Sequence, residues 1–167
     1  MAEGERDICE QLERQLRDVR VWTRKLTDRT PDERLYRRVE WTDNTIGWHM
    51  GHLAQQQDLD AYQCFGADRM LDAEWDRLFG FGCEVYPTEE YPSPERLRRV
   101  FDTALRRFLE NLSQVEEDRG LLARPIHRPD WMSPSWTILN CAVNTIFHEG
   151  EHSNGIGTLL ASFEKQD

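Results

Sequence analysis

The sequence has 167 residues, of which 38% are hydrophobic and 10% aromatic. This length fits one domain, residues 1–167, and the apolar content excludes a disordered chain. No run approaches the roughly eighteen apolar residues of a membrane span, and the polar, acidic N-terminus predicts no export signal. The 21 basic and 31 acidic residues give a net charge of −10, which repels phosphate backbones and anionic lipids. We therefore expect neither a nucleic-acid nor a membrane partner.

The cysteines indicate a reducing compartment. Cys9, Cys64, Cys83 and Cys141 lie far apart in the sequence and form no C-x-x-C pair. A chain with this much apolar material does not need disulfides to hold a core. We interpret the four as reduced thiols and expect the protein to be cytoplasmic. Cys141 fits a small buried hydrophobe better than a nucleophile.

Two amphipathic helices are predicted in the first 65 residues. Between about Glu5 and Arg29, apolar residues recur at steps of three and four. Thr30-Pro31 ends this helix, because proline disfavours α geometry in the residue before it. A second helix is expected to run to about Phe65. Its N-cap is expected at one of three consecutive polar residues, Thr42, Asp43 or Asn44.

Two further helices are predicted to begin at prolines. Ser93-Pro94-Glu95 supplies a cap, a first-turn proline and a favourable acid, and Ser133-Pro134 opens the last helix, which runs to about Phe163. Residues 66–92 form a long connection with a short helical piece near 71–79, and connections of this length are usually functional or mobile. Four amphipathic helices without strand alternation predict an all-α four-helix bundle, with the long connection between helices 2 and 3.

The candidate chemistry lies in the histidines. His148 and His152 are four residues apart on the last predicted helix, so both imidazoles lie on one face and can reach one metal ion. His49 and His52 lie three residues apart on the second predicted helix, and one of them is enough to complete three ligands. An open three-histidine site keeps a coordination position for a substrate. Zn, Ni, Fe, Mn and Co all accept such ligands, so the identity of the divalent metal stays open.

The same segment also matches the H-E-x-x-H motif of zinc peptidases, in which the glutamate activates water. This interpretation ranks second, because no sheet is predicted and no histidine or cysteine follows His152. Glu149 projects about 100° around the helix from His148, towards the apolar Ile138 and Ile156. We treat Glu149 as the candidate catalytic acid or base of the site, or as a partner that orients a ligand.

Two short motifs resemble a known family. Trp48-x-x-Gly51-His52-Leu53, followed far downstream by His148-Glu149-x-x-His152, is similar to the DinB/YfiT-like superfamily, and the resemblance covers about residues 5–163. It implies a DinB-like four-helix bundle with one histidine on the second helix and an H-x-x-x-H pair on the fourth. It also implies that His52, His148 and His152 are the metal ligands. His49 is then left to line the substrate cavity.

The resemblance leaves three functions open. The superfamily includes thiol S-transferases, and the N-terminal domain of ergothioneine sulfoxide synthases is similar. The leading hypothesis is therefore a metal-dependent enzyme that transfers a low-molecular-weight thiol to an electrophilic small molecule. The alternatives are a metal-dependent hydrolase, in which Glu149 activates water at the metal, and a non-catalytic metal- or ligand-binding bundle. Because short bundles of this group often pair and six tryptophans leave aromatics for an interface, we expect a homodimer.

Overall fold

Four long helices dominate the structure, in the order that the sequence predicts. The computed structural model describes residues 2–114, 120–126 and 136–165. The long helices are α1 (Ala2–Thr27), α2 (Ile46–Phe65), α4 (Pro94–Ser113) and α5 (Ile138–Glu164). A fifth, short helix, α3 (Ala73–Phe79), lies in the connection between α2 and α4, where a short helical piece is predicted. The described ranges contain only two isolated bridges and no strand, so the all-α prediction is confirmed.

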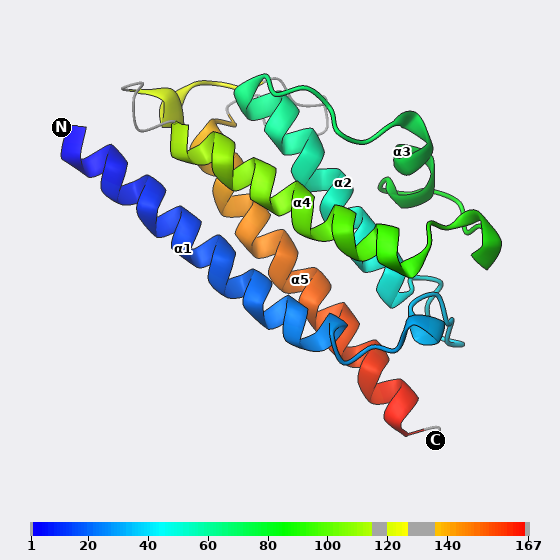
Figure 1. The fold of residues 1–167 in the computed structure, drawn as a ribbon. Helices are drawn as coiled ribbons and strands as arrows, with labels where there is room; N and C mark the ends of the chain where they lie inside the picture. The colour runs from blue at the N-terminus through cyan, green and yellow to red at the C-terminus, as the bar shows by residue number, and fades with distance from the viewer. Residues whose placement is uncertain (1, 115–119, 127–135, 166–167) are drawn as a thin grey trace.

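The long helices lie side by side (Figure 1). α2 packs against α4 and α5, and α1 packs closely against α5 but only sparsely against α4. α1 and α5 run in the same direction, and Arg29, just beyond the end of α1, reaches Glu164 at the end of α5 with 2.7 Å between nitrogen and oxygen. α3 packs against α2. Within the described part of the chain, no helix is long and apolar enough to cross a membrane.

The start of α4 is confirmed, whereas the predicted start of α2 is wrong. Ser93 caps α4 by accepting a hydrogen bond from the backbone N–H of Arg96, and Pro94 occupies the first turn. The cap of α2 is Thr45, which accepts from the backbone N–H of Trp48. The three predicted caps lie in the preceding turn, because Thr42 pairs with Val39 and accepts from the backbone N–H of Asn44.

The predicted start of α5 is also wrong. Thr137 and Asn140 form a capping box, in which each side chain bonds the other residue's backbone N–H. The backbone of Thr137 is extended and bridges to Pro125, so α5 begins after Thr137. The dipeptide Ser133-Pro134 lies outside the described residues.

The core consists of two apolar clusters with a polar layer between them. Cys9, Leu12 and Leu16 of α1 belong to one cluster, and Leu53 of α2 and Leu159 of α5 belong to the other. Buried polar side chains extend from α1, α2 and α5, among them Arg20, Thr23, His49, His52, Gln57, Glu149 and Ser153. The structure holds no disulfide among the four cysteines. The candidate site belongs to this polar layer.

Candidate metal centre

α2 and α5 bring three histidines together at one point. His52 comes from α2 and His148 and His152 from α5, and one ligand atom of each lies within 4.8 Å of the others. The Nε2 atom of His148 is 3.2 Å from Nε2 of His52 and 3.0 Å from Nε2 of His152. Two nitrogens bound tetrahedrally to one zinc ion at about 2.05 Å lie about 3.3 Å apart, so these spacings fit one shared ion. Within the described residues, this is the one group of histidine, cysteine and acidic side chains close enough to hold a metal.

The ring of His52 is held by α3. Its Nδ1 donates to the backbone carbonyl of Phe79 at 2.6 Å, which leaves the Nε2 lone pair directed at the other histidines. Trp48 stacks on the face of the His52 ring, with ring centroids 4.8 Å apart and planes 9° apart. A Cβ atom on Gly51 would overlap the Phe79 ring, so glycine at this position allows α3 to approach. The tryptophan and glycine that precede His52 in the sequence motif thus both support its orientation.

His152 is held by His49, a fourth histidine that lies beside the three. The Nδ1 atoms of His49 and His152 are 2.6 Å apart, so one of them donates and the other accepts. Metal binding through Nε2 requires His152 to carry its proton on Nδ1, which makes His49 the acceptor. Gly155 leaves the space, because a Cβ atom there would lie 2.8 Å from Cε1 of His49. The lining of a substrate cavity by His49 stays a prediction, whereas its contact with His152 is direct.

Burial keeps the four imidazoles neutral. It lowers the pKa of His49 to about 4, and repulsion from His52 and His148 adds to this effect. The pKa of His148 also falls to about 4, through burial and the charge of His52. Burial lowers the pKa of His52 and, together with repulsion from the neighbouring histidines, lowers that of His152 further. Because a metal ligand must be a neutral imidazole, the site is ready to bind a cation at pH 7.

Glu149 is fully buried in an ion pair that the sequence does not predict. Its Oε1 accepts from Nε of Arg20 at 2.5 Å, and its Oε2 accepts from Nη2 of Arg20 and from Gln57, both at 2.9 Å. Arg20 also donates to the carbonyl of Phe101, so a single guanidinium on α1 joins α2, α4 and α5. Arg20 lies four residues after Leu16, inside the apolar stripe of α1, and a charged residue at such a position is the sequence signal for a buried ion pair.

The predicted acid–base role of Glu149 stays a prediction. Among the described side chains, its carboxylate bonds Arg20 and Gln57 and makes no hydrogen bond to a histidine of the cluster. It is buried, as its apolar neighbours in the sequence suggest. The carboxylate therefore anchors the segment of α5 that carries His148 and His152.

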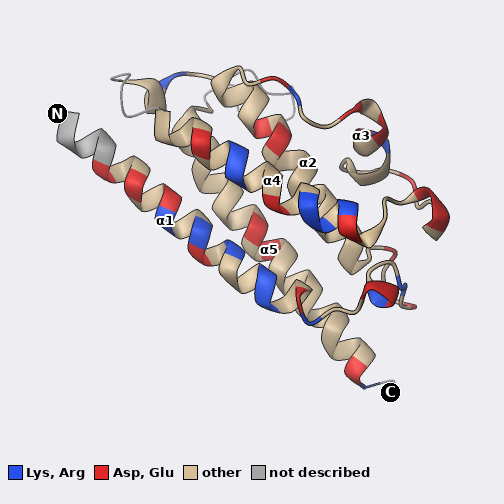
Figure 2. Ribbon diagram, in the orientation of Figure 1, with Lys and Arg blue, Asp and Glu red and all other residues tan. Residues whose placement is uncertain are grey.

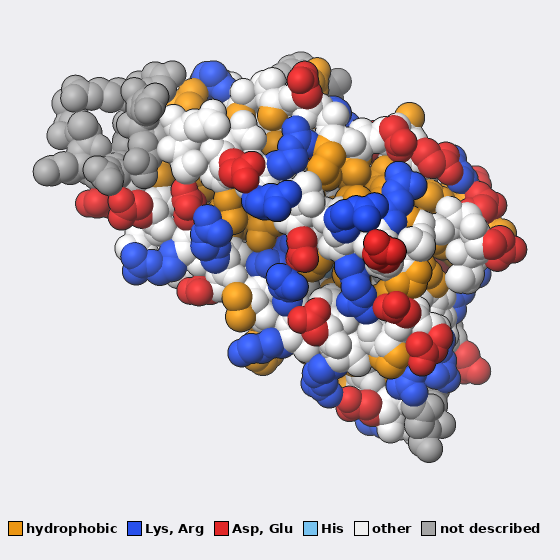
Figure 3. Space-filling model, viewed as in Figure 1, with side chains coloured by type: hydrophobic (Ala, Val, Ile, Leu, Met, Phe, Trp, Pro, Cys, Tyr) orange, Lys and Arg blue, Asp and Glu red, His pale blue; other side chains and the backbone are white. Residues whose placement is uncertain are grey.

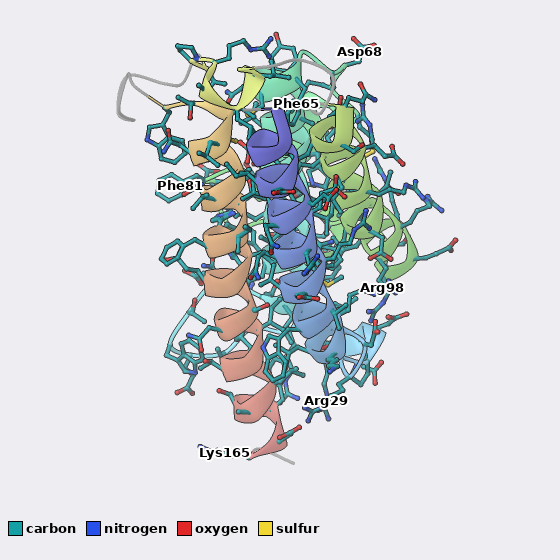
Figure 4. The ribbon with its side chains drawn as sticks, turned by 90° about the vertical axis from the view of Figure 1, so that its left-hand side faces the viewer. Arg29, Phe65, Asp68, Phe81, Arg98 and Lys165 are labelled. Atoms are coloured by element: carbon teal, nitrogen blue, oxygen red, sulfur yellow. The ribbon has the colours of Figure 1, made fainter. Side chains whose placement is uncertain are left out.

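α3 and the connection that follows it pass close to the three-histidine cluster. Trp75 and Phe79 are buried against α2, and the indole N–H of Trp75 donates to the carbonyl of Gly51 at 3.0 Å. The indole N–H of Trp48 donates to Sγ of Cys83 at 3.3 Å, which places this half-buried thiol beside the ring that covers His52. Phe81 is 92% exposed and projects at the outer edge of the view in Figure 4.

Fold and cluster together define an all-α protein in which two long helices hold three histidines at the spacing of metal ligands. A family model, that of the DinB superfamily, matches residues 15–155, a stretch that includes all three histidines. The chain belongs to the DinB superfamily, as the resemblance of its motifs implies. A search of curated proteins finds no match.

Proposed function

We propose that the protein is a metal-dependent enzyme that transfers a low-molecular-weight thiol to an electrophilic small molecule, built on a four-helix bundle of the DinB-like type. The observation that carries the proposal is the convergence of three Nε2 atoms, with 3.0 and 3.2 Å between neighbours, in a chain whose motifs resemble a superfamily that includes thiol S-transferases. His52, His148 and His152 would hold one divalent ion. When bound, that ion would lower the pKa of a thiol and so supply a thiolate nucleophile at neutral pH.

The residues of the chain support this chemistry by fixing the ligands in advance. The carbonyl of Phe79 fixes the tautomer of His52, and His49 does the same for His152. Only three described side chains form the group, so a position remains for a fourth donor from the substrate. A neutral three-histidine site also accepts an anionic thiolate without opposing charge from a protein carboxylate.

The environment of Glu149 favours thiol transfer over hydrolysis. A hydrolase would need a carboxylate that can take a proton from water, whereas both oxygens of Glu149 accept hydrogen bonds from Arg20 and Gln57. Thiol transfer has no such need, because the ion itself lowers the pKa of the nucleophile. Thiol dependence of turnover separates the two reactions, and failure of both substrate classes would favour a non-catalytic metal-binding bundle.

Thiol binding to cobalt-substituted protein tests the proposal. Mycothiol, bacillithiol, glutathione and cysteine are each added, and we expect one of them to produce a sulfur-to-cobalt charge-transfer band with release of a proton. His52→Ala should abolish the band, and Glu149→Gln should retain it.

Cys83→Ser is the control for an internal thiol, because Cys83 is the cysteine in contact with Trp48. A band produced by Cys83 alone, or the absence of a band with all four thiols, would refute thiol transfer and leave the metal site as a separate question.

A further inference from the structure

A groove of about 570 Å³ separates α1 from α4 and contains none of the four clustered histidines. It exists because α1 packs closely against α5 and touches α4 only sparsely. Its lining consists of four arginines, three aliphatic residues and one acid: Arg17, Arg20, Arg24, Arg106, Val21, Leu105, Leu109 and Asp102. The volume lies within the range of small-molecule sites, which is about 300–1,000 Å³.

The apolar part of the lining runs along both helices. Leu105 and Leu109 lie one turn apart on α4 and are 5% and 4% exposed, so they form the floor. Val21 of α1 is 53% exposed at the groove, an aliphatic side chain with much of its surface in water. An apolar chain laid along the groove would therefore remove this surface from water.

The lining itself carries four arginines against one acid in a chain whose net charge is −10. Basic residues, with acidic residues between them, lie on α1 and α4 where the two helices run beside each other (Figure 2), and the same face of the molecule shows Lys and Arg side chains among apolar and acidic ones (Figure 3). Arg20 is already paired with Glu149, which leaves Arg17, Arg24 and Arg106 at the rim.

The rim arginines are available to a ligand. Each of the three arginines lies near a carboxylate, with 3.5 to 3.8 Å between the guanidinium nitrogen and the carboxylate oxygen, and the arginine side chains are 52 to 66% exposed. Exposed pairs of this kind contribute about 0–1 kcal/mol, so a guanidinium can turn to a better anion at little cost. Guanidinium groups bind carboxylates through two parallel hydrogen bonds, which is the geometry that a ligand carboxylate offers.

We propose that this groove binds a free anionic amphiphile, a single acyl chain with a carboxylate head. The chain lies on Leu105, Leu109 and Val21, and the head contacts Arg17 and Arg106. A partner's helix would need a longer apolar surface than these three side chains provide. The site is independent of the metal centre.

Calorimetric titration with dodecanoate, below the concentration at which it forms micelles, tests the proposal. We expect binding that weakens by about tenfold or more in Arg17→Gln/Arg106→Gln, because two charged hydrogen-bond donors are lost. The matched control is Arg14→Gln/Arg99→Gln, which removes two exposed arginines of the same helices outside the groove lining and should bind as the wild type does. Val21→Trp should block the groove.

Further titrations identify the kind of ligand that binds and show whether the groove acts independently of the metal centre. Dodecyltrimethylammonium and vesicles of anionic phospholipid should not bind, and dodecanoate should bind equally to His148→Ala/His152→Ala. Four results would overturn the proposal. Two are absence of dodecanoate binding and equally tight binding of the cationic amphiphile. The others are an unchanged affinity in Arg17→Gln/Arg106→Gln and a loss of dodecanoate binding in His148→Ala/His152→Ala. So would a wild-type dimer that the groove substitutions dissociate, since the occupant would then be a second copy of the chain.

Discussion

Replacement of His49 by leucine tests how the metal centre is held together. His49 is 8% exposed and lies 2.6 Å from Nδ1 of His152, so leucine removes the acceptor and leaves a buried N–H without a partner. Loss of a hydrogen-bond partner of a ligating histidine typically costs about 10–100-fold in metal affinity. We expect His49→Leu to weaken zinc binding by an amount in this range, or about 1.4–2.7 kcal/mol.

His49→Asn is the matching conservative change. The side-chain oxygen of asparagine can replace Nδ1 of histidine as the acceptor, so we expect it to restore most of the affinity. Gln55→Leu is the control for burial, because Gln55 lies on the same helix, is also 8% exposed and donates to Asp76 rather than to a histidine. It should leave zinc affinity unchanged.

Competition with a chromophoric chelator measures the affinities, and nitrogen-15 NMR of the imidazoles reports the tautomer. In the zinc-bound wild type, we expect the proton of His152 on Nδ1. Equal affinities of the leucine and asparagine variants, or a leucine variant as tight as the wild type, would refute a positioning role for His49.

Three further predictions concern stability. The free energy of unfolding of metal-free protein, measured in urea, should fall as the pH drops from about 6.5 to 4. The pKa of His49 is about 4 in the folded state and about 6.5 in the unfolded state, so the unfolded state binds more protons in this window, and the difference corresponds to about 3 kcal/mol. A flat pH profile would contradict burial of neutral imidazoles. Gly51→Ala should destabilise the protein by about 1–3 kcal/mol and weaken zinc binding, because the added methyl group displaces Phe79; an unchanged urea midpoint would refute this packing. Glu149→Gln should lower the free energy of unfolding by about 3 kcal/mol or more, because the charge of Arg20 stays buried without its partner. The double variant Arg20→Met/Glu149→Leu should recover part of that loss. If both variants are equally unstable, the ion pair is not the cause.

The features that the sequence predicts well are those set within one helix. Apolar periodicity identifies the long helices, and the spacing of His148 and His152 places both rings on one face because that spacing is a property of the helix alone. The Ser93-Pro94 start of α4 is confirmed for the same local reason. Thr45 and Thr137 were missed as caps because several neighbouring residues can cap a helix, and the choice depends on the turns that precede it.

The features that the sequence does not predict join distant parts of the chain. The pairing of His49 with His152 spans 103 positions, and that of Arg20 with Glu149 spans 129. Both depend on the register between packed helices, which periodicity does not determine. The acceptor for His52 is a backbone carbonyl, that of Phe79, and every residue has one, so no residue type marks it.

Metal content measured on the purified protein, followed by zinc titration after chelation, is the most direct test of the three-histidine centre. We expect about one divalent ion per chain, removal by a chelator, and rebinding that is much weaker in His148→Ala/His152→Ala and in His52→Ala. If the wild type carries no metal as purified and binds zinc no more tightly than the His148→Ala/His152→Ala variant, the three histidines do not form a metal site.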